Sequence, residues 1–227
     1  MKEQNEANQA IEINDFISKA EAFLEKYKNH IYIGVAAVII IIAGIFGLKK
    51  LYFEPRAEEA AGEMFMAENF FDNYDYDKAL NGDKESNSLG FLDIISDYKG
   101  TEAANLAYYY AGVCELRLGQ YEEAIEHLKK FSSTDNYVKP LALMAQGDAE
   151  AELQNNDKAL ALYEKAAAKG DNILVAPTAL FKAGMMYLAM QKNDKAIACF
   201  NKVKEKYPES TEYSDMDKYI AVAEASK

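Results

Sequence analysis

The stretch GVCELRLGQYEEAIEHLKKF, residues 112–131, decides the fold, because a turn at Gly119 separates two apolar patterns with helical spacing. The pattern recurs as GDAEAELQNNDKALALYEKA from residue 147 and as GMMYLAMQKNDKAIACFNKV from residue 184. In each stretch a glycine is followed by an alanine at one fixed offset and by a large residue at another: Gly112, Ala124 and Leu128; Gly147, Ala159 and Tyr163; Gly184, Ala196 and Phe200. A period of about 35 residues predicts stacked helical hairpins.

The composition agrees with an all-α chain. Alanine, leucine, lysine and glutamate are frequent, and only 4 prolines occur in 227 residues, which favours helix. No stretch alternates apolar and polar residues well enough to predict a strand.

The repeated pattern resembles the tetratricopeptide repeat, a helix–turn–helix unit of about 34 residues. In that family, small residues stand where the two helices touch and large residues fill the space between repeats. Pro208, after Lys206 and Tyr207, resembles the proline that closes the motif. The resemblance implies an α-solenoid with repeats at 105–139, 140–176 and 177–210.

The segments on either side of these repeats are predicted to cap the solenoid. Residues 54–104 resemble a degenerate helical pair: a helix over 57–74, a polar loop over 79–90 that enlarges the turn, and a helix over 91–100. Residues 211–227 contain one closing helix, Asp215 to Ser226. Terminal repeats need a polar outer face, which this closing helix has.

Residues 31–48, IYIGVAAVIIIIAGIFGL, carry no charge and are about 27 Å long as a helix, enough for a bilayer core. With snorkelling Lys49 and Lys50, the predicted anchor extends over 31–53. A buried core helix is the alternative, although such a helix usually has a polar stripe. A cleaved signal peptide is disfavoured, because about thirty polar residues with several acids precede the run.

Residues 1–30 combine a polar segment with an amphipathic helix that leads to the anchor, whose apolar positions are Ile13, Phe16, Ile17, Ala20, Phe23, Leu24 and Tyr27. This helix could lie on the lipid surface, dock on a partner's membrane segment, or simply continue the anchor. Basic residues flank the apolar run equally, with Lys19, Lys26 and Lys28 before it and Lys49, Lys50 and Arg56 after it, so charge does not decide the orientation.

The sequence contains no pattern typical of an enzyme, metal or cofactor site. His30 and His127 have no ligand partner at helical spacing, and nucleophile and phosphate-binding motifs are missing. Cys114 and Cys199 fit buried small residues better than a disulfide. The net charge is -12, with 31 acidic and 19 basic residues from Glu54 onward, which repels nucleic acid. We therefore expect protein partners.

In the tetratricopeptide family, the first helix of each repeat lines a concave groove. The fifth position of each repeat here is Tyr109, Met144 or Phe181, and the ninth is Val113, Asp148 or Met185. Family members that clamp a partner's C-terminal carboxylate carry lysine and asparagine there, and this chain departs from that pattern. An apolar groove for a hydrophobic helix or extended segment is expected instead. Alternatively, these side chains pack against the closing helix, Met216 to Ala223.

The whole layout resembles the membrane-anchored ancillary subunits of the bacterial Sec translocon. Residues 91–112 also resemble repeats of envelope proteins that coordinate outer-membrane assembly and cell division. Either resemblance implies a bacterial inner-membrane scaffold with a cytoplasmic N-terminus and periplasmic repeats, and with the translocon or another envelope complex, client polypeptides or chaperones as partners. The alternative is a cytosol-facing docking receptor for soluble proteins.

Overall fold

The computed structural model describes the backbone of residues 2–226, without the side chains of residues 2–16, 18–24 and 31. Most of the amphipathic face expected before the anchor, from Ile13 to Leu24, therefore lies outside the described residues. Among the described residues every regular element is a helix, and the only strand-like pairing there is an isolated bridge between Asp83 and Ser88. The predicted all-helical class is confirmed.

The chain divides into two compact units, residues 1–55 and 56–227. The first unit consists of α1 (Lys2–Leu48) and a π-helical turn, η1 (Lys49–Phe53). One helical stretch of the described chain is long and apolar enough to cross a bilayer by length and composition, and its most apolar window is wholly exposed. Membrane anchoring through residues 31–53 stays a prediction.

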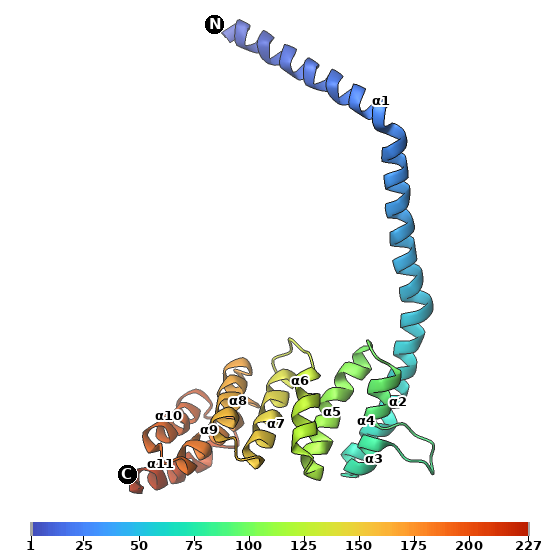
Figure 1. The fold of residues 1–227 in the computed structure, drawn as a ribbon. Coiled ribbons are helices and arrows are strands. Elements are labelled where there is room, and N and C mark those ends of the chain that lie inside the picture. Colours follow the sequence, from blue (N-terminus) through green and yellow to red (C-terminus); the bar gives the residue numbers. More distant parts are fainter. Residues whose placement is uncertain (1, 227) are drawn as a thin grey trace. The chain divides into compact units, whose positions relative to one another are not determined.

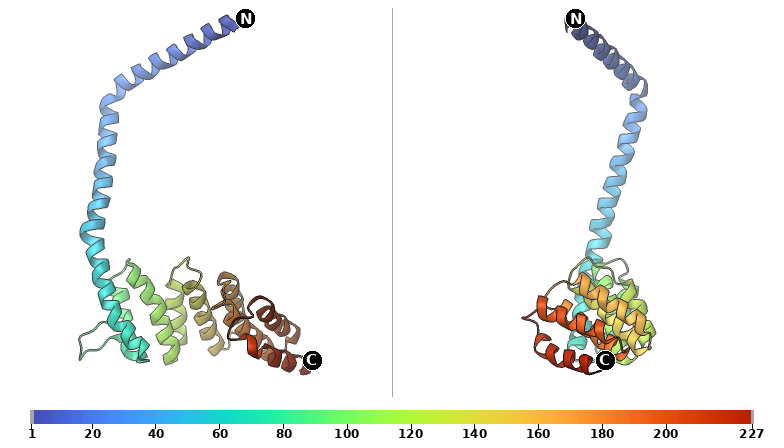
Figure 2. Two further views of the ribbon diagram at one scale, coloured as in Figure 1. Left: turned by 180° about the vertical axis from the view of Figure 1, so that it is seen from behind. Right: turned by 90° about the vertical axis from the view of Figure 1, so that its left-hand side faces the viewer.

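The second unit is a row of antiparallel helix pairs (Figures 1 and 2). Three pairs follow the predicted period: α5 (Glu102–Leu118) with α6 (Tyr121–Lys130), α7 (Val138–Glu152) with α8 (Asn156–Lys169), and α9 (Ala176–Ala189) with α10 (Asn193–Lys206). A short 3₁₀ turn, η2 (Tyr213–Asp215), leads to the closing helix α11 (Met216–Ala225).

The repeated glycines are places where the two helices of a pair touch. A Cβ atom added to Gly112 would lie 2.4 Å from Leu128 Cγ, one added to Gly147 would lie 2.6 Å from Tyr163 Cε1, and one added to Gly184 would lie 2.4 Å from Phe200 Cε1. The alanines of the pattern, Ala124, Ala159 and Ala196, have no exposed surface. Each pair thus packs a large side chain of the second helix directly onto the backbone of the first.

The turn between the two helices also repeats. Gly119 has φ +80°, and the residues at the same position of the next two repeats, Gln154 and Gln191, have φ +62° and +57°. In each turn the following amide bonds back to a carbonyl of the first helix; the pairs are Gln120 to Glu115, Asn155 to Glu150 and Lys192 to Tyr187, at 2.8, 2.8 and 2.9 Å. One residue with left-handed backbone angles thus ends each first helix and reverses the chain, and this residue need not be glycine.

The N-terminal helix pair has the same tight turn between its two helices, whereas the sequence predicted an enlarged turn there. After α2 (Glu54–Asp72), Tyr74 has φ +62° and the Asp75 amide bonds to the Phe70 carbonyl at 2.9 Å. The expected enlarged turn is therefore wrong: the turn is tight, and the polar loop interrupts the second helix, which consists of α3 (Tyr76–Asn81) and α4 (Phe91–Asp97). Periodicity does not distinguish a loop between two helices from a loop inside one.

The loop leaves and re-enters the second helix at nearly the same point. A Cβ added to Gly90 would lie 2.3 Å from the Gly82 nitrogen and 2.4 Å from the Leu80 carbonyl oxygen. Beyond the loop, Phe91, Ile94 and Tyr98 are buried with the same spacing as Phe200, Val203 and Tyr207 in α10. We interpret residues 54–100 as a full repeat with an insertion.

The glycine contacts generate a stability prediction. Gly184→Ala places a methyl group against the buried ring of Phe200, so we expect the free energy of unfolding to fall by about 1–3 kcal/mol. The measurement is a urea titration of the full chain in detergent, followed by near-ultraviolet circular dichroism. Gly62→Ala is the matched control, because nothing lies within 4 Å of the added Cβ and alanine favours the helix by about 0.5–1 kcal/mol. Equal midpoints for the two variants would contradict the close approach.

Candidate functional site

The six predicted groove residues lie on first helices but differ in accessibility. Tyr109 and Val113 of α5 are half-buried in one apolar cluster, and the Tyr109 ring centroid is 5.6 Å from that of Phe131. Met144 of α7 is buried in the core that spans the second and third repeats. Tyr109 and Val113 can therefore contribute contact surface to a bound partner, while Met144 contributes packing.

The two predicted residues of α9 have different surroundings. Phe181 is half-buried, with its ring centroid 4.9 Å from that of Tyr219 in α11 and 6.2 Å from that of Phe200. Phe181 therefore packs against the closing helix, as the alternative in the sequence analysis expected. Met185, four residues later, is 38% exposed and is the most accessible apolar residue of the six. A binding role for the six residues stays a prediction.

Asp148 is the polar centre of the groove. Its Oδ1 accepts a hydrogen bond from Lys182 Nζ at 2.7 Å and a second from the Tyr163 hydroxyl at 2.9 Å. Lys182 belongs to the next repeat, so the pair joins α7 to α9 across 34 residues of sequence. Both charged side chains keep about a third of their surface exposed, which screens the attraction between them.

A cleft of about 290 Å³ surrounds this pair and crosses three repeats. Its polar lining comes from five elements: Arg117, Tyr121, Asp148, Glu152, Tyr163 and Lys182. Arg117 and Glu152 are exposed, and neither forms an ion pair with any side chain that the structure describes. Arg117 and Glu152 each lie eight residues after a predicted groove residue, Tyr109 and Met144, so the same repeat register could have identified them. No sequence pattern predicts the pairing of Lys182 with Asp148.

The Tyr163 hydroxyl keeps its proton under neutral conditions. Burial is the main cause that raises its pKa, and the adjacent Asp148 carboxylate raises it further. A protonated hydroxyl donates to Asp148 rather than competing with it for the Lys182 ammonium group. The cleft therefore presents a fixed arrangement of donors and acceptors, suited to recognising polar groups of a partner.

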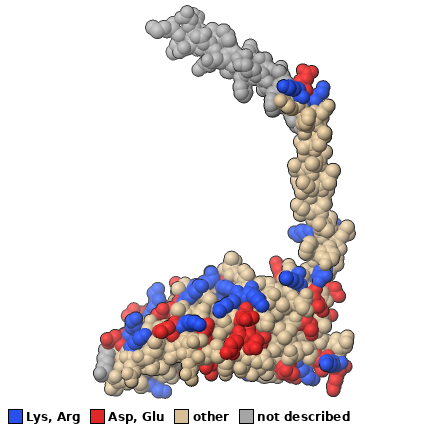
Figure 3. Space-filling model, in the orientation of Figure 1, with Lys and Arg blue, Asp and Glu red and all other residues tan. Residues whose placement is uncertain are grey.

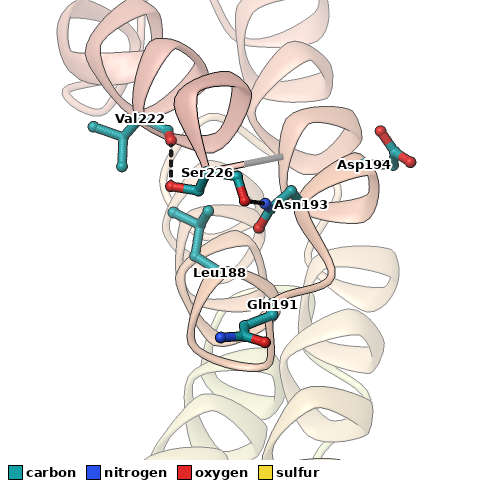
Figure 4. Close-up of a pocket in the computed structure, with 6 residues that line it drawn as sticks. All are labelled: Leu188, Gln191, Asn193, Asp194, Val222 and Ser226. Carbon is teal, nitrogen blue, oxygen red and sulfur yellow. Dashed lines mark hydrogen bonds between the residues drawn. The ribbon is translucent and has the colours of Figure 1, made fainter.

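A larger hollow of about 800 Å³ lies where the turn between α9 and α10 meets the end of α11 (Figure 4). Its polar groups bond largely to one another: Asn193 Nδ2 donates to the Ser226 carbonyl at 2.7 Å, and Ser226 Oγ donates to the Val222 carbonyl at 2.8 Å. Asp194 is the only ionisable residue in its lining. The hollow contains no group of residues that suggests chemistry.

The described residues contain no cluster of three or more histidine, cysteine or acidic side chains that could hold a metal ion. His127 Nδ1 lies 2.8 Å from the buried Glu115 carboxylate, a contact that joins the two helices of the first repeat. Cys114 and Cys199 are free thiols. Burial raises their pKa values to about 12 and about 11, so both stay protonated and poorly nucleophilic.

The Tyr163–Asp148 contact generates a prediction for the cleft. Tyr163→Phe keeps the ring against Gly147 but removes the hydroxyl bond to Asp148, which we expect to lower the unfolding free energy by about 1–2 kcal/mol. Urea titration of Tyr163→Phe, Asp148→Ala and the double variant measures the coupling, which should be about 0.5 kcal/mol or more. Tyr121→Phe, in the same cleft, should change stability by less than about 0.5 kcal/mol. Strictly additive effects would show that the bond does not stabilise the fold.

Two segments of the chain, residues 106–134 and 178–210, match the family model of the tetratricopeptide repeat. They cover the first and third hairpins, and the second hairpin has the same glycine contact and the same left-handed turn. No curated protein matches the chain. Repeats of this family are typically non-catalytic and suggest a protein–protein interaction scaffold. The matches and the repeated geometry together support membership of the tetratricopeptide repeat family.

Proposed function

We propose that this protein is a membrane-anchored scaffold that holds partner proteins in the groove of its tetratricopeptide repeats. The observation that carries the proposal is the cleft around Asp148 and Lys182, which combines side chains from three consecutive repeats. A site that extends over several repeats suits an elongated polypeptide segment better than a small molecule.

The chemistry of the cleft supports a partner segment with both charged and apolar side chains. Arg117 and Glu152 offer one positive and one negative group at the rim. Tyr109 and Val113, on the same helix as Arg117, add partly exposed apolar surface. Because Lys182 is already engaged by Asp148, one cation remains at this rim, which argues against a carboxylate clamp.

The anchor is supported by the exposure of the apolar helix. From Ile33 to Phe46 its large aliphatic and aromatic side chains are exposed, and the run carries no charge. A continuous apolar surface of this length is costly in water and matches the thickness of a hydrocarbon core. We assign residues 31–53 as a single membrane span.

The cellular setting follows from the resemblance to ancillary subunits of the Sec translocon. In this proposal the N-terminus is cytoplasmic and the repeats lie in the periplasm of a bacterial cell. There they would assist translocon-linked secretion or the folding and assembly of envelope proteins, by holding client polypeptides or recruiting a chaperone. A cytosol-facing docking receptor is the competing arrangement.

The groove is tested by site-specific photocrosslinking in cells, with a photoreactive residue in place of Glu152. We expect specific adducts that decrease by roughly tenfold or more in the Arg117→Glu background, because the reversed charge repels the partner group that the arginine would attract. Lys202→Glu is the control, since it makes the same charge reversal on an exposed second-helix position outside the cleft. Unchanged adducts in both backgrounds would remove the groove from the proposal.

The orientation is tested by protease protection, with an epitope tag at each end of the chain. In osmotically opened cells with an intact inner membrane, external protease should destroy the C-terminal tag and the repeats while the N-terminal tag survives. Survival of the repeats until the inner membrane is broken would support the cytosolic receptor instead. Release of the whole chain from washed membranes by high salt would exclude a membrane span.

A further inference from the structure

The basic side chains of the repeat domain lie mainly along one of its two edges (Figure 3). The second helices begin with acidic residues, such as Glu122 and Glu123 in α6 and Asp157 in α8, and end with basic ones. This arrangement complements the helix dipole. At the intra-repeat turns these acidic side chains are mixed with Lys158, Lys192 and Lys195, whereas lysines gather at the helix ends beside the segments that join one repeat to the next. Figure 3 shows lysine and arginine side chains concentrated along one edge of the repeat domain.

We call the edge formed by segments 98–101, 131–137 and 170–175 the inter-repeat edge. Near its middle stands a group of lysines at the ends of α6 and α8 and at the start of α7: Lys129, Lys130, Lys139, Lys165 and Lys169. Four are exposed, while Lys139 is half-buried and donates to the Phe131 carbonyl at 2.6 Å. Burial lowers the pKa of Lys139, and the charges of Lys165 and Lys169 lower it further, which is consistent with their proximity.

The acidic residues of the same loops already have hydrogen-bond donors. Asp135 accepts bonds from the amides of Tyr137 and Val138, at 2.6 and 2.8 Å. Asp171 accepts a bond from the Tyr207 hydroxyl. Among the described side chains, neither carboxylate forms an ion pair with a lysine of the group. The four exposed lysines of the group thus remain available to an external anion.

Large apolar side chains project from the same loops. Leu174 is 70% exposed, Tyr137 49% and Ile173 42%. Asn172 holds the two loops side by side, because its Nδ2 donates to the Asn136 carbonyl at 3.1 Å and its Oδ1 accepts from the Leu174 amide at 3.0 Å. The apolar residues are therefore presented on bonded loops next to the lysines.

This edge is also where the chain enters the repeat domain. Arg56, near the start of α2, donates to the Asp97 carbonyl and lies 5.9 Å from the Tyr98 ring centroid, at the first inter-repeat segment. Asn105 links this region to the next segment through two bonds with Ser132, at 2.8 and 3.0 Å. Only two residues separate Phe53, the end of the predicted span, from Arg56, so the chain can reach about 10 Å at most between them.

We propose that the inter-repeat edge rests on an anionic lipid bilayer, with the lysine group against lipid phosphates and with Tyr137, Ile173 and Leu174 in the interface. Basic residues beside exposed aromatic and aliphatic ones are the combination that binds lipid surfaces peripherally. This inference rests on the proposed membrane span, which brings the edge within reach of lipid. The acidic turns would then point away from the surface.

The test uses the absence of tryptophan from the chain, because Leu174→Trp then carries the only indole. The full chain is reconstituted into bilayers of phosphatidylcholine with or without phosphatidylglycerol, and quenching of the indole by brominated lipid is measured. Tyr74→Trp is the matched control, at a position 78% exposed in an intra-repeat turn. Phe46→Trp, inside the apolar run, reports on the span itself.

We expect strong quenching for Phe46→Trp in both bilayers, quenching for Leu174→Trp only with phosphatidylglycerol, and none for Tyr74→Trp. Replacing Lys129, Lys130, Lys165 and Lys169 by glutamine should reduce quenching of Leu174→Trp to the control level, since each lysine strengthens attraction to an anionic surface by about fivefold. Molar salt should have the same effect.

The outcomes separate this inference from the proposed function. If Phe46→Trp is quenched but Leu174→Trp stays at the level of Tyr74→Trp in anionic bilayers, the lipid-facing edge is wrong and the span stands. If Phe46→Trp is not quenched, the span itself fails, and the inference fails with it. If Leu174→Trp is quenched equally with the four lysines replaced, the lysine group has no part in lipid binding.

Discussion

The three repeats from α5 to α10 depend on the contact between a backbone glycine of the first helix and a large side chain of the second helix. Because each glycine has only a hydrogen atom in place of a side chain, the Leu128, Tyr163 and Phe200 side chains lie directly on the backbone of the first helix. Helix pairs that approach so closely leave room for only one relative placement of the two axes. Because the contact recurs, each hairpin presents nearly the same faces to its neighbours, and stacking gives a continuous core.

The identity of the large residue then differentiates the repeats. In the second repeat it is a tyrosine, so the side chain that packs on Gly147 also delivers a hydroxyl to Asp148 in the cleft. In the third repeat it is a phenylalanine, which joins Phe181 and Tyr219 in an aromatic cluster beneath α11. One packing position therefore supports a polar cleft in the middle of the row and an apolar closure at its end.

The direction of the helices has a consequence for the surface. All second helices run the same way, so basic side chains that complement their dipoles accumulate at the edge where these helices end. The edge that gathers lysines is also the one at which Arg56 brings the chain into the domain. A solenoid tethered at such an edge can combine attraction to lipid on that edge with a groove that remains open to proteins, which is how the two proposals fit together.

The sequence by itself determined the helical class, the period and the small and large contact positions, because these depend on residue types that recur at fixed spacing. It also placed Tyr109 and Val113 on the first helix of the first repeat, where they remain partly accessible. Only the tertiary structure decided that the N-terminal polar loop lies inside a second helix, since a tight turn at Tyr74 uses a left-handed residue that no glycine marks. It alone paired Lys182 with Asp148, and it decided between the two alternatives for Phe181, which packs against Tyr219 of the closing helix. Such contacts depend on how neighbouring repeats stack, and residues 34 or more positions apart leave no periodic trace of which of them will meet.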